Sequence, residues 1–312
     1  MQIRIPHGVS YDGNSWLRSL YVRELNGYDE RYLSALREDI PLSAKTTELL
    51  ARVTILPAID GSPIEEDEDE GAEEEEQSKK SRRFVSKTSF LLNIADIVSR
   101  MTLGDRIAIL LHLRRLTFGE IMSCEINCQS CKEIISMRIS VSDMLQPSTE
   151  LQPKSEYEVS IDSYALRVRL PNAKDQEAIL SLDKSSNISQ YTQHAVKSLI
   201  LSALPILPND ISNDFLAKVS SKLGELDPQS DIVLNITCPH CNYFFQTAFI
   251  VEDFIFQEIA ARQRLLEEEV HWLAFHYHWN ESEILSLPVR RRKKYVELIN
   301  RSLSGENSTH DY

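Results

Sequence analysis

Two Cys-x-x-Cys pairs, 110 residues apart, constrain the fold of this chain more than any other feature. The first pair is Cys128 and Cys131, and the second is Cys238 and Cys241. Each pair places two thiols on a tight turn, where both sulfurs can face one metal ion, and four thiolates suit tetrahedral Zn²⁺. We therefore predict one structural zinc site with these four cysteines as its ligands. The chain between the pairs must then fold so that its two ends meet.

The residues around each pair favour a metal site over other cysteine chemistry. The β-type runs 121–127 and 232–236 lead into the pairs, and apolar residues of β type follow them. Neither pair precedes a helix pattern, and a redox pair needs a helix N-terminus to lower the pKa of one thiol. A disulfide or redox role is the alternative, and a contribution of Cys124 or His240 to the metal site is left open.

The two halves of the chain share more than the cysteine pairs. At an offset of 146 residues, Val, Arg, Asn and Asp coincide at Val22, Arg23, Asn26 and Asp29 and at Val168, Arg169, Asn172 and Asp175. The cysteine pairs match at an offset of 110, and an insert of about 36 residues in the first half would reconcile the two offsets. We therefore predict a tandem duplication and an α+β fold. Two helix-plus-β-hairpin halves are joined by a zinc-ribbon-like four-Cys site, and a C-terminal helical segment follows.

Most of the net charge of −13 comes from one segment. Residues 65–76 hold ten of the 47 acidic residues, which leaves 37 acidic residues against 34 basic ones elsewhere. Such a block cannot bury enough apolar surface to offset the entropy of ordering, so residues 57–87 are predicted to be a disordered insert. The predicted divisions are 1–146 for the first half, 147–251 for the second half and 252–304 for the C-terminal helices.

Capping and periodicity predict the local structure at several positions. Helical periodicity predicts a helix over residues 189–203, and Ser43 is expected to cap a helix that ends near residue 54. Thr102 and Asp105 have the spacing of a capping box. In that motif the threonine oxygen accepts from a first-turn amide and the carboxylate reaches back to the cap amide.

No catalytic motif is present. The sequence lacks G-x-S-x-G, a P-loop, a Gly-rich dinucleotide turn and H-E-x-x-H, and a closed four-thiolate site leaves no position for a water nucleophile. We therefore predict that the protein is not an enzyme. The histidines His271, His276 and His278 lie in an aromatic segment and are interpreted as packing residues rather than as a second metal site.

The basic cluster Arg290–Lys294 suggests an alternative function. It opens a helix after a helix-turn connection, so the alternative is a zinc-ribbon nucleic-acid-binding regulator. A solvated helix face is the simpler interpretation, because no aromatic residue interleaves the basic ones, and nucleic acid is not the favoured partner. The sequence has no apolar run of membrane length and no signal-peptide core, which predicts a cytoplasmic protein without membrane association.

The chain also resembles a known group of proteins. The resemblance is carried by Leu103-Gly-Asp-Arg106, Leu113–Gly119, the two cysteine pairs, Val141-Ser-Asp143, Leu226-Asp-Pro228, Glu269-Val270, Tyr277-x-Trp279 and Arg291-Arg-x-x-Tyr295. Similar proteins are encoded in gene clusters for phage-tail-like contractile injection systems. They are similar in turn to baseplate hub and hub-assembly proteins of T-even-type phages. The resemblance covers most of the chain outside residues 57–87. It implies a structural or assembly role among baseplate, hub or tail subunits, as a permanent component or as a chaperone absent from the finished particle.

Overall fold

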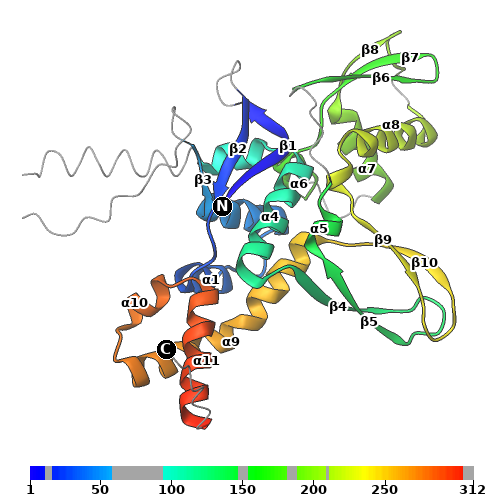
Figure 1. Ribbon diagram of the computed structural model, residues 1–312. Helices are drawn as coiled ribbons and strands as arrows, with labels where there is room; N and C mark the ends of the chain where they lie inside the picture. Colours follow the sequence, from blue (N-terminus) through cyan, green and yellow to red (C-terminus); the bar gives the residue numbers. More distant parts are fainter. Residues whose placement is uncertain (11–15, 58–93, 147–153, 181–187, 209–210, 305–312) are drawn as a thin grey trace, which may run out of the picture.

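Helices and short antiparallel sheets alternate along the chain (Figure 1). The structure is a computed structural model, and it describes residues 1–10, 16–57, 94–146, 154–180, 188–208 and 211–304. Within these residues, four antiparallel sheets of two or three strands lie among the helices, which confirms a mixed helix and sheet fold. Apart from Pro57, the predicted disordered insert lies outside the described residues. No helix in the described segments is long and apolar enough to cross a membrane.

The first half begins with a three-stranded sheet in the order β1-β2-β3. Its elements are β1 (Gln2–Ser10), β2 (Trp16–Val22), α1 (Gly27–Ser34), α2 (Leu42–Val53) and β3 (Thr54–Ile55). The prediction that Ser43 caps α2 is wrong. Pro41 occupies the N-cap position of this helix, with a φ of −56°, and no side chain makes a capping hydrogen bond there. Ser43 lies inside the first turn, and its carbonyl accepts a hydrogen bond from Arg106.

The second half has the same element order, with a sheet in the order β6-β7-β8. Its elements are β6 (Tyr157–Ile161), β7 (Tyr164–Val168), α6 (Ala173–Leu180), α7 (Ile188–Leu199) and β8 (Ile200–Leu204). The helix predicted over residues 189–203 therefore ends at Leu199, and the residues after it form a strand. Residues 200–204 pair with β7. These ladder hydrogen bonds come from a distant strand, which local periodicity cannot detect.

Each half continues with a helix and a two-stranded ribbon, and three helices end the chain. In the first half these are α4 (Leu103–Phe118), β4 (Ile121–Asn127), β5 (Ile134–Ser140) and the short α5 (Val141–Met144). In the second half they are α8 (Asn213–Leu226), the 3₁₀ turn η1 (Pro228–Ser230), β9 (Val233–Thr237) and β10 (Phe244–Ala248). The last helices are α9 (Val251–Tyr277), α10 (Glu281–Ser286) and α11 (Val289–Ser304). Residues 94–100 are also helical and precede α4.

The largest hydrophobic core surrounds α4. Eleven of its 16 residues are buried, as expected for a helix that is covered on most sides. This core joins β1, β2 and α2 to the first turns of α9 through Val251, Ile255 and Ile259. A second core lies within the second half, a third lies between the two ribbons, and a fourth joins α9, α10 and α11. The last three helices, α9 to α11, form an arm below the body, which comprises the other described elements (Figure 1). The two ribbons project side by side from the rest of the body.

Candidate functional site

The two cysteine turns have the same backbone geometry. β4 pairs with β5, and β9 pairs with β10, so each turn closes an antiparallel ribbon. In the first turn, the amide of Cys128 donates to the carbonyl of Glu133 at 2.9 Å, and the amide of Lys132 donates to the carbonyl of Cys128 at 3.1 Å. The matching bonds of the second turn run from Cys238 to Tyr243 at 2.9 Å and from Asn242 to Cys238 at 2.9 Å. Lys132 and Asn242 both have a positive φ, of 66° and 58°, which tightens each turn around its thiols.

The two turns bring all four thiols together, with every Sγ atom within 4.8 Å of the others. The Sγ atoms of Cys128 and Cys241 are 3.7 Å apart, and those of Cys131 and Cys238 are also 3.7 Å apart. The first cysteine of each pair thus lies beside the second cysteine of the other pair. A tetrahedron with metal–sulfur bonds of about 2.3 Å has edges of about 3.8 Å, so the arrangement fits a four-thiolate metal site.

The surroundings of the thiols favour a thiolate at one of them. Burial raises the pKa of the Cys128 thiol. Hydrogen bonds from the amides of Cys131 and Ser130 and from the neighbouring thiols outweigh this effect and lower the pKa to about 6. At Cys131 the amide of Glu133 lowers the pKa, but burial and the neighbouring thiols raise it to about 12. The amides of Ser130 and Cys131 therefore stabilise Cys128 as a thiolate, which is the form that binds a metal cation.

The other candidate ligands lie outside this group. Cys124 is half-buried on β4 opposite Met137, and burial raises the pKa of its thiol. His240 is exposed within the second turn. In the described part of the chain, the four cysteines are the one group of three or more cysteine, histidine or acidic residues that could hold a metal ion. The ribbons pack together through a small core made of Cys128, Ile135, Ile236, Cys238 and Phe245.

Two of the three histidines, His271 and His276, make ring contacts along α9, and His278 is the left-handed C-cap residue of that helix. The ring of His276 stacks on that of Trp272, with the centroids 5.3 Å apart and the planes 7° apart. The ring of His271 stacks on that of Phe275 at 6.3 Å. These side chains form an aromatic surface on the arm.

A second polar cluster lies where the two halves meet. Asp227 follows α8, and its carboxylate accepts a hydrogen bond from the amide of Gly104, in the first turn of α4, at 2.9 Å. The negative charge lies at the positive end of the α4 dipole, which is a favourable position. The same carboxylate lies 3.2 Å from Nε2 of His7, and Nδ1 of that ring lies 3.0 Å from the hydroxyl of Tyr157. Two motifs of the resemblance, Leu103–Arg106 and Leu226–Pro228, therefore meet here.

The predicted capping box at the start of α4 is half correct. The hydroxyl of Thr102 accepts from the amide of Asp105 at 3.2 Å, as expected. The carboxylate of Asp105 does not reach back to the cap. Its two oxygens accept from the amides of His7 and Gly8, each at 2.8 Å. These two donors on β1 point at the buried carboxylate, and a distant segment therefore takes the place of the local partner.

Gly104 permits this close contact between the halves, so Gly104→Ala is expected to destabilise the protein by about 1–3 kcal/mol. A Cβ atom at this position would lie 1.8 Å from an oxygen of Asp227. Gly224→Ala is the matched control. Gly224 lies in α8 with no atom within 4 Å of an added Cβ, and the change should stabilise the protein by about 0.5–1 kcal/mol. Urea unfolding measures both changes. Equal effects of the two substitutions would contradict the role of Gly104.

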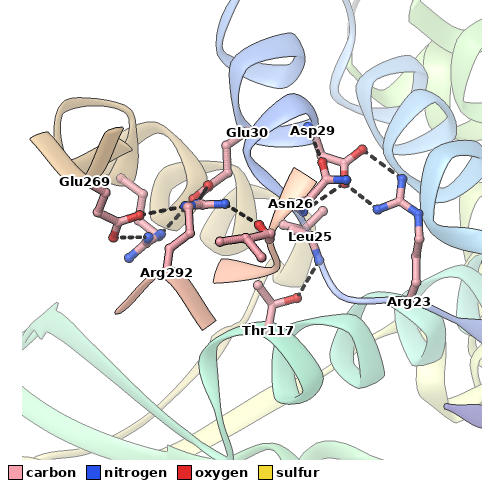
Figure 2. A network of polar contacts seen from close by, with 10 residues as sticks. Arg23, Leu25, Asn26, Asp29, Glu30, Thr117, Glu269 and Arg292 are labelled. Atoms are coloured by element: carbon pink, nitrogen blue, oxygen red, sulfur yellow. Dashed lines mark hydrogen bonds and ion pairs between the residues drawn. The ribbon is translucent and has the colours of Figure 1, made fainter. Parts of the chain in front are cut away.

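A buried set of two acids and two arginines fastens the arm to the body. Glu30 of α1, Arg262 and Glu269 of α9, and Arg292 of α11 are all nearly inaccessible. Arg262 contacts Glu30 at 2.8 Å and Glu269 at 2.9 Å. Arg292 contacts Glu269 at 2.9 Å and also pairs with Glu30 (Figure 2). Each carboxylate thus meets both guanidinium groups, and the charges balance.

The matching Asn-x-x-Asp turns have the same hydrogen bonds in both halves. Arg23 contacts both carboxylate oxygens of Asp29 (Figure 2), and Arg169 contacts both oxygens of Asp175 at 2.7 Å. The side chain of the asparagine accepts from the aspartate amide in each turn, at 3.0 Å and 3.3 Å. The asparagine of each turn also forms an isolated β-bridge with the residue just before a helix. Asn26 pairs with Pro288 before α11, and Asn172 pairs with Thr102 before α4.

The basic cluster Arg290–Lys294 does not act as one surface. Arg292, at its centre, is fully buried in the ion set described above. The other four residues are exposed on α11 and make no salt bridge with any residue that the structure describes.

The cysteines can be identified from the sequence, but the two buried polar clusters cannot. The partners of His7 and Glu30 lie roughly 100 to 260 residues away, and no local pattern connects them. One signal was available: Arg262 and Glu269 share a helical face with Leu266 and Leu273, where apolar residues are expected. Charged residues on a buried face require partners of opposite charge.

Part of the chain matches a known protein family. The family described as T4 bacteriophage base plate protein matches residues 72–255, which are 184 of the 312 residues. The matched segment contains both cysteine pairs and both motifs of the junction between the halves. No curated protein and no solved structure matches the chain. Because the match covers more than half of the chain, the protein belongs to the T4 bacteriophage base plate protein family.

Proposed function

We propose that this protein is a zinc-stabilised, non-enzymatic structural protein or assembly chaperone of the baseplate hub in a phage tail or phage-tail-like contractile injection system. The observation that carries the proposal is the family match, which includes all four cysteines. Its partners would be other hub, baseplate or tail subunits, and it would act in the cytoplasm, where such particles assemble. The role of the four cysteines would be structural, because four thiolates leave no open coordination position on the metal.

We propose Zn²⁺ as the metal. Four sulfur ligands in tetrahedral geometry select zinc or an iron–sulfur centre. Two tight Cys-x-x-Cys turns, each closing an antiparallel ribbon, are typical of structural zinc sites. The metal would hold the two ribbons, and with them the two halves, in a fixed orientation. Purified protein should therefore contain one zinc ion per chain by elemental analysis.

We propose that the two halves arose by tandem duplication. The shared sheet order, the matching Arg-Asn-Asp turns and the matching cysteine turns support this origin. The proposed divisions remain 1–146, 147–251 and 252–304, with a zinc-ribbon-like site between the first two. Reciprocal contacts, in which the first cysteine of each pair meets the second cysteine of the other, are expected from two related halves facing each other.

The proposed mechanism is presentation of apolar surface to partner subunits. The arm carries several exposed large apolar side chains, namely Leu265, Trp272, Phe275, Leu298 and Leu303. Phe275 is 65% exposed, and its ring contacts those of His271 and His276. Exposed apolar groups of this kind mark protein interfaces.

Phe275→Glu is therefore expected to abolish co-purification with baseplate subunits while the thermal midpoint changes little. The introduced charge would be desolvated by a partner but remains in water in the free protein. Gln263→Glu is the matched control, because it adds the same charge at another exposed position of α9. Affinity purification from cells that assemble the particle gives the measurement. Retention of the partners by the Phe275 variant would exclude this surface.

Two measurements separate a permanent component from a chaperone. Deleting the gene should prevent baseplate assembly in either case, and normal assembly without the protein would refute the proposed function. The amount of the chain in purified finished particles then decides between the two roles. A component is present in fixed copy number, whereas a chaperone is found only with intermediates.

The alternative function, a nucleic-acid-binding regulator, would depend on the exposed cations of α11. The burial of Arg292 removes the central residue from such a surface. A gel-shift titration with salt tests the alternative, since phosphate contacts make log affinity fall with log salt concentration. Absence of binding at low salt would exclude it.

A further inference from the structure

We propose that His7, Asp105, Tyr157 and Asp227 form a proton-binding site that couples the packing of the two halves to pH. His7 and Asp105 belong to the first half, and Tyr157 and Asp227 belong to the second. His7 is only 7% exposed, and both ring nitrogens contact the second half. This imidazole is therefore one of the direct links between the halves, beside the bond from the Gly104 amide to Asp227.

The site can accept a proton without losing a hydrogen bond. In a neutral imidazole, Nε2 donates to Asp227 at 3.2 Å, and Nδ1 accepts from the hydroxyl of Tyr157 at 3.0 Å. In the charged imidazolium both nitrogens donate, and the hydroxyl of Tyr157 can rotate to act as the acceptor. Only the charge of the cluster then changes.

The charges around His7 favour the protonated form. Among the described residues, His7 faces the carboxyl groups of Asp227 after α8 and Asp105 of α4 and the hydroxyl of Tyr157 of β6, and the charge of Arg18 of β2 acts against its protonation. Burial lowers the pKa of His7, but the hydrogen bond and charge of Asp227 and the charge of Asp105 outweigh it, so the pKa is raised. Without the proton, two carboxylates share a buried region with a neutral ring.

The pKa of Asp105 is also raised in the folded state. Complete burial raises the pKa of this carboxyl to about 6, although the amides of His7 and Gly8 and the charge of His7 act to lower it. For both groups the folded state holds a proton more tightly than the unfolded state. The stabilisation from His7 is present below pH 6.5 and is lost as pH rises through its raised pKa. The contribution of Asp105 decreases between about pH 4 and pH 6.

The expected result is an interface between the halves that is tighter in mild acid than in mild base. A difference of one bound proton changes the folding equilibrium constant by up to tenfold per pH unit. Above pH 6.5 the wild type should therefore lose stability at up to this rate, until the pH passes the pKa of His7. Other ionising groups also change stability with pH, so the comparison with a variant that lacks the imidazole isolates the effect.

The test uses the full chain and the variant His7→Gln, whose amide can donate to Asp227 and accept from Tyr157 but cannot ionise. Urea unfolding from pH 5.5 to pH 8.5 should show a steeper loss of stability for the wild type than for the variant. His194→Gln is the control, because His194 is exposed on α7. It should retain the wild-type dependence.

Carbon-13 NMR of histidine-labelled protein gives a second, direct readout. The signal of His7 should titrate above pH 6.5, the ordinary value for histidine. Tyr157→Phe should displace this signal and so assign it without removing the imidazole, which keeps the test available if His7→Gln does not fold. A titration of His7 at or below pH 6.5 would overturn the proposal. Identical pH dependence of the wild type and His7→Gln would also overturn it.

Discussion

Replacing Cys238 with serine is expected to destabilise the whole protein rather than one surface of it. Cys238 is buried, and its sulfur lies 3.7 Å from that of Cys131 in the other ribbon. Structural zinc contributes on the order of 10 kcal/mol in small isolated sites, and loss of one ligand of four forfeits much of this free energy. Here the metal would also close a loop of more than a hundred residues. The thermal midpoint should fall, and both halves should become susceptible to proteolysis.

Cys124→Ser provides the matched control for this experiment. Cys124 is a half-buried cysteine of the same ribbon that lies outside the group of four. Its replacement should change the thermal midpoint little and leave the zinc content at one ion per chain. Treatment of the wild-type protein with a strong chelator should reproduce the effect of Cys238→Ser. A thermal midpoint that survives chelation unchanged would rule out a stabilising role for the metal.

Arg292→Met is expected to lower the free energy of unfolding by about 3–5 kcal/mol, because removing one partner leaves a buried charge without compensation. The carboxylates of Glu30 and Glu269 would then share the single guanidinium of Arg262. Methionine keeps most of the apolar stem, so lost packing contributes little. Urea unfolding followed by circular dichroism measures the change, and the arm of α9 and α11 should loosen first.

Two further variants separate charge from packing at this position. Arg291→Met removes an exposed arginine from the neighbouring position of α11, and we expect a change below about 0.5 kcal/mol. The double variant Arg292→Met with Glu30→Gln removes one charge of each sign. It should be less destabilised than the sum of the two single variants, because the remaining pair is neutral. Additive losses would indicate that the four groups do not act as one set.

The strands that lead into the two cysteine turns could be predicted because their signals are local. The β-type runs 121–127 and 232–236 are patterns of a few residues, and β4 and β9 form there. Two of the errors occurred where a distant partner replaced a local one. Residues 200–204 form a strand because they pair with the edge of β7. The carboxylate of Asp105 accepts hydrogen bonds from two amides of β1 instead of from its own helix cap.

The sequence by itself determined which cysteines could bind a metal and suggested that the halves are related, because both signals are spacings along the chain. It also indicated the family through short motifs. Only the tertiary structure decided how those motifs are used. It joined Leu103–Arg106 to Leu226–Pro228 through Asp227 and Gly104, and it buried Arg292 between two glutamates. Buried ion pairs and hydrogen bonds form between groups that the fold brings within about 3 Å of each other. When those groups are 100 residues or more apart along the chain, the sequence alone does not show which of them will meet.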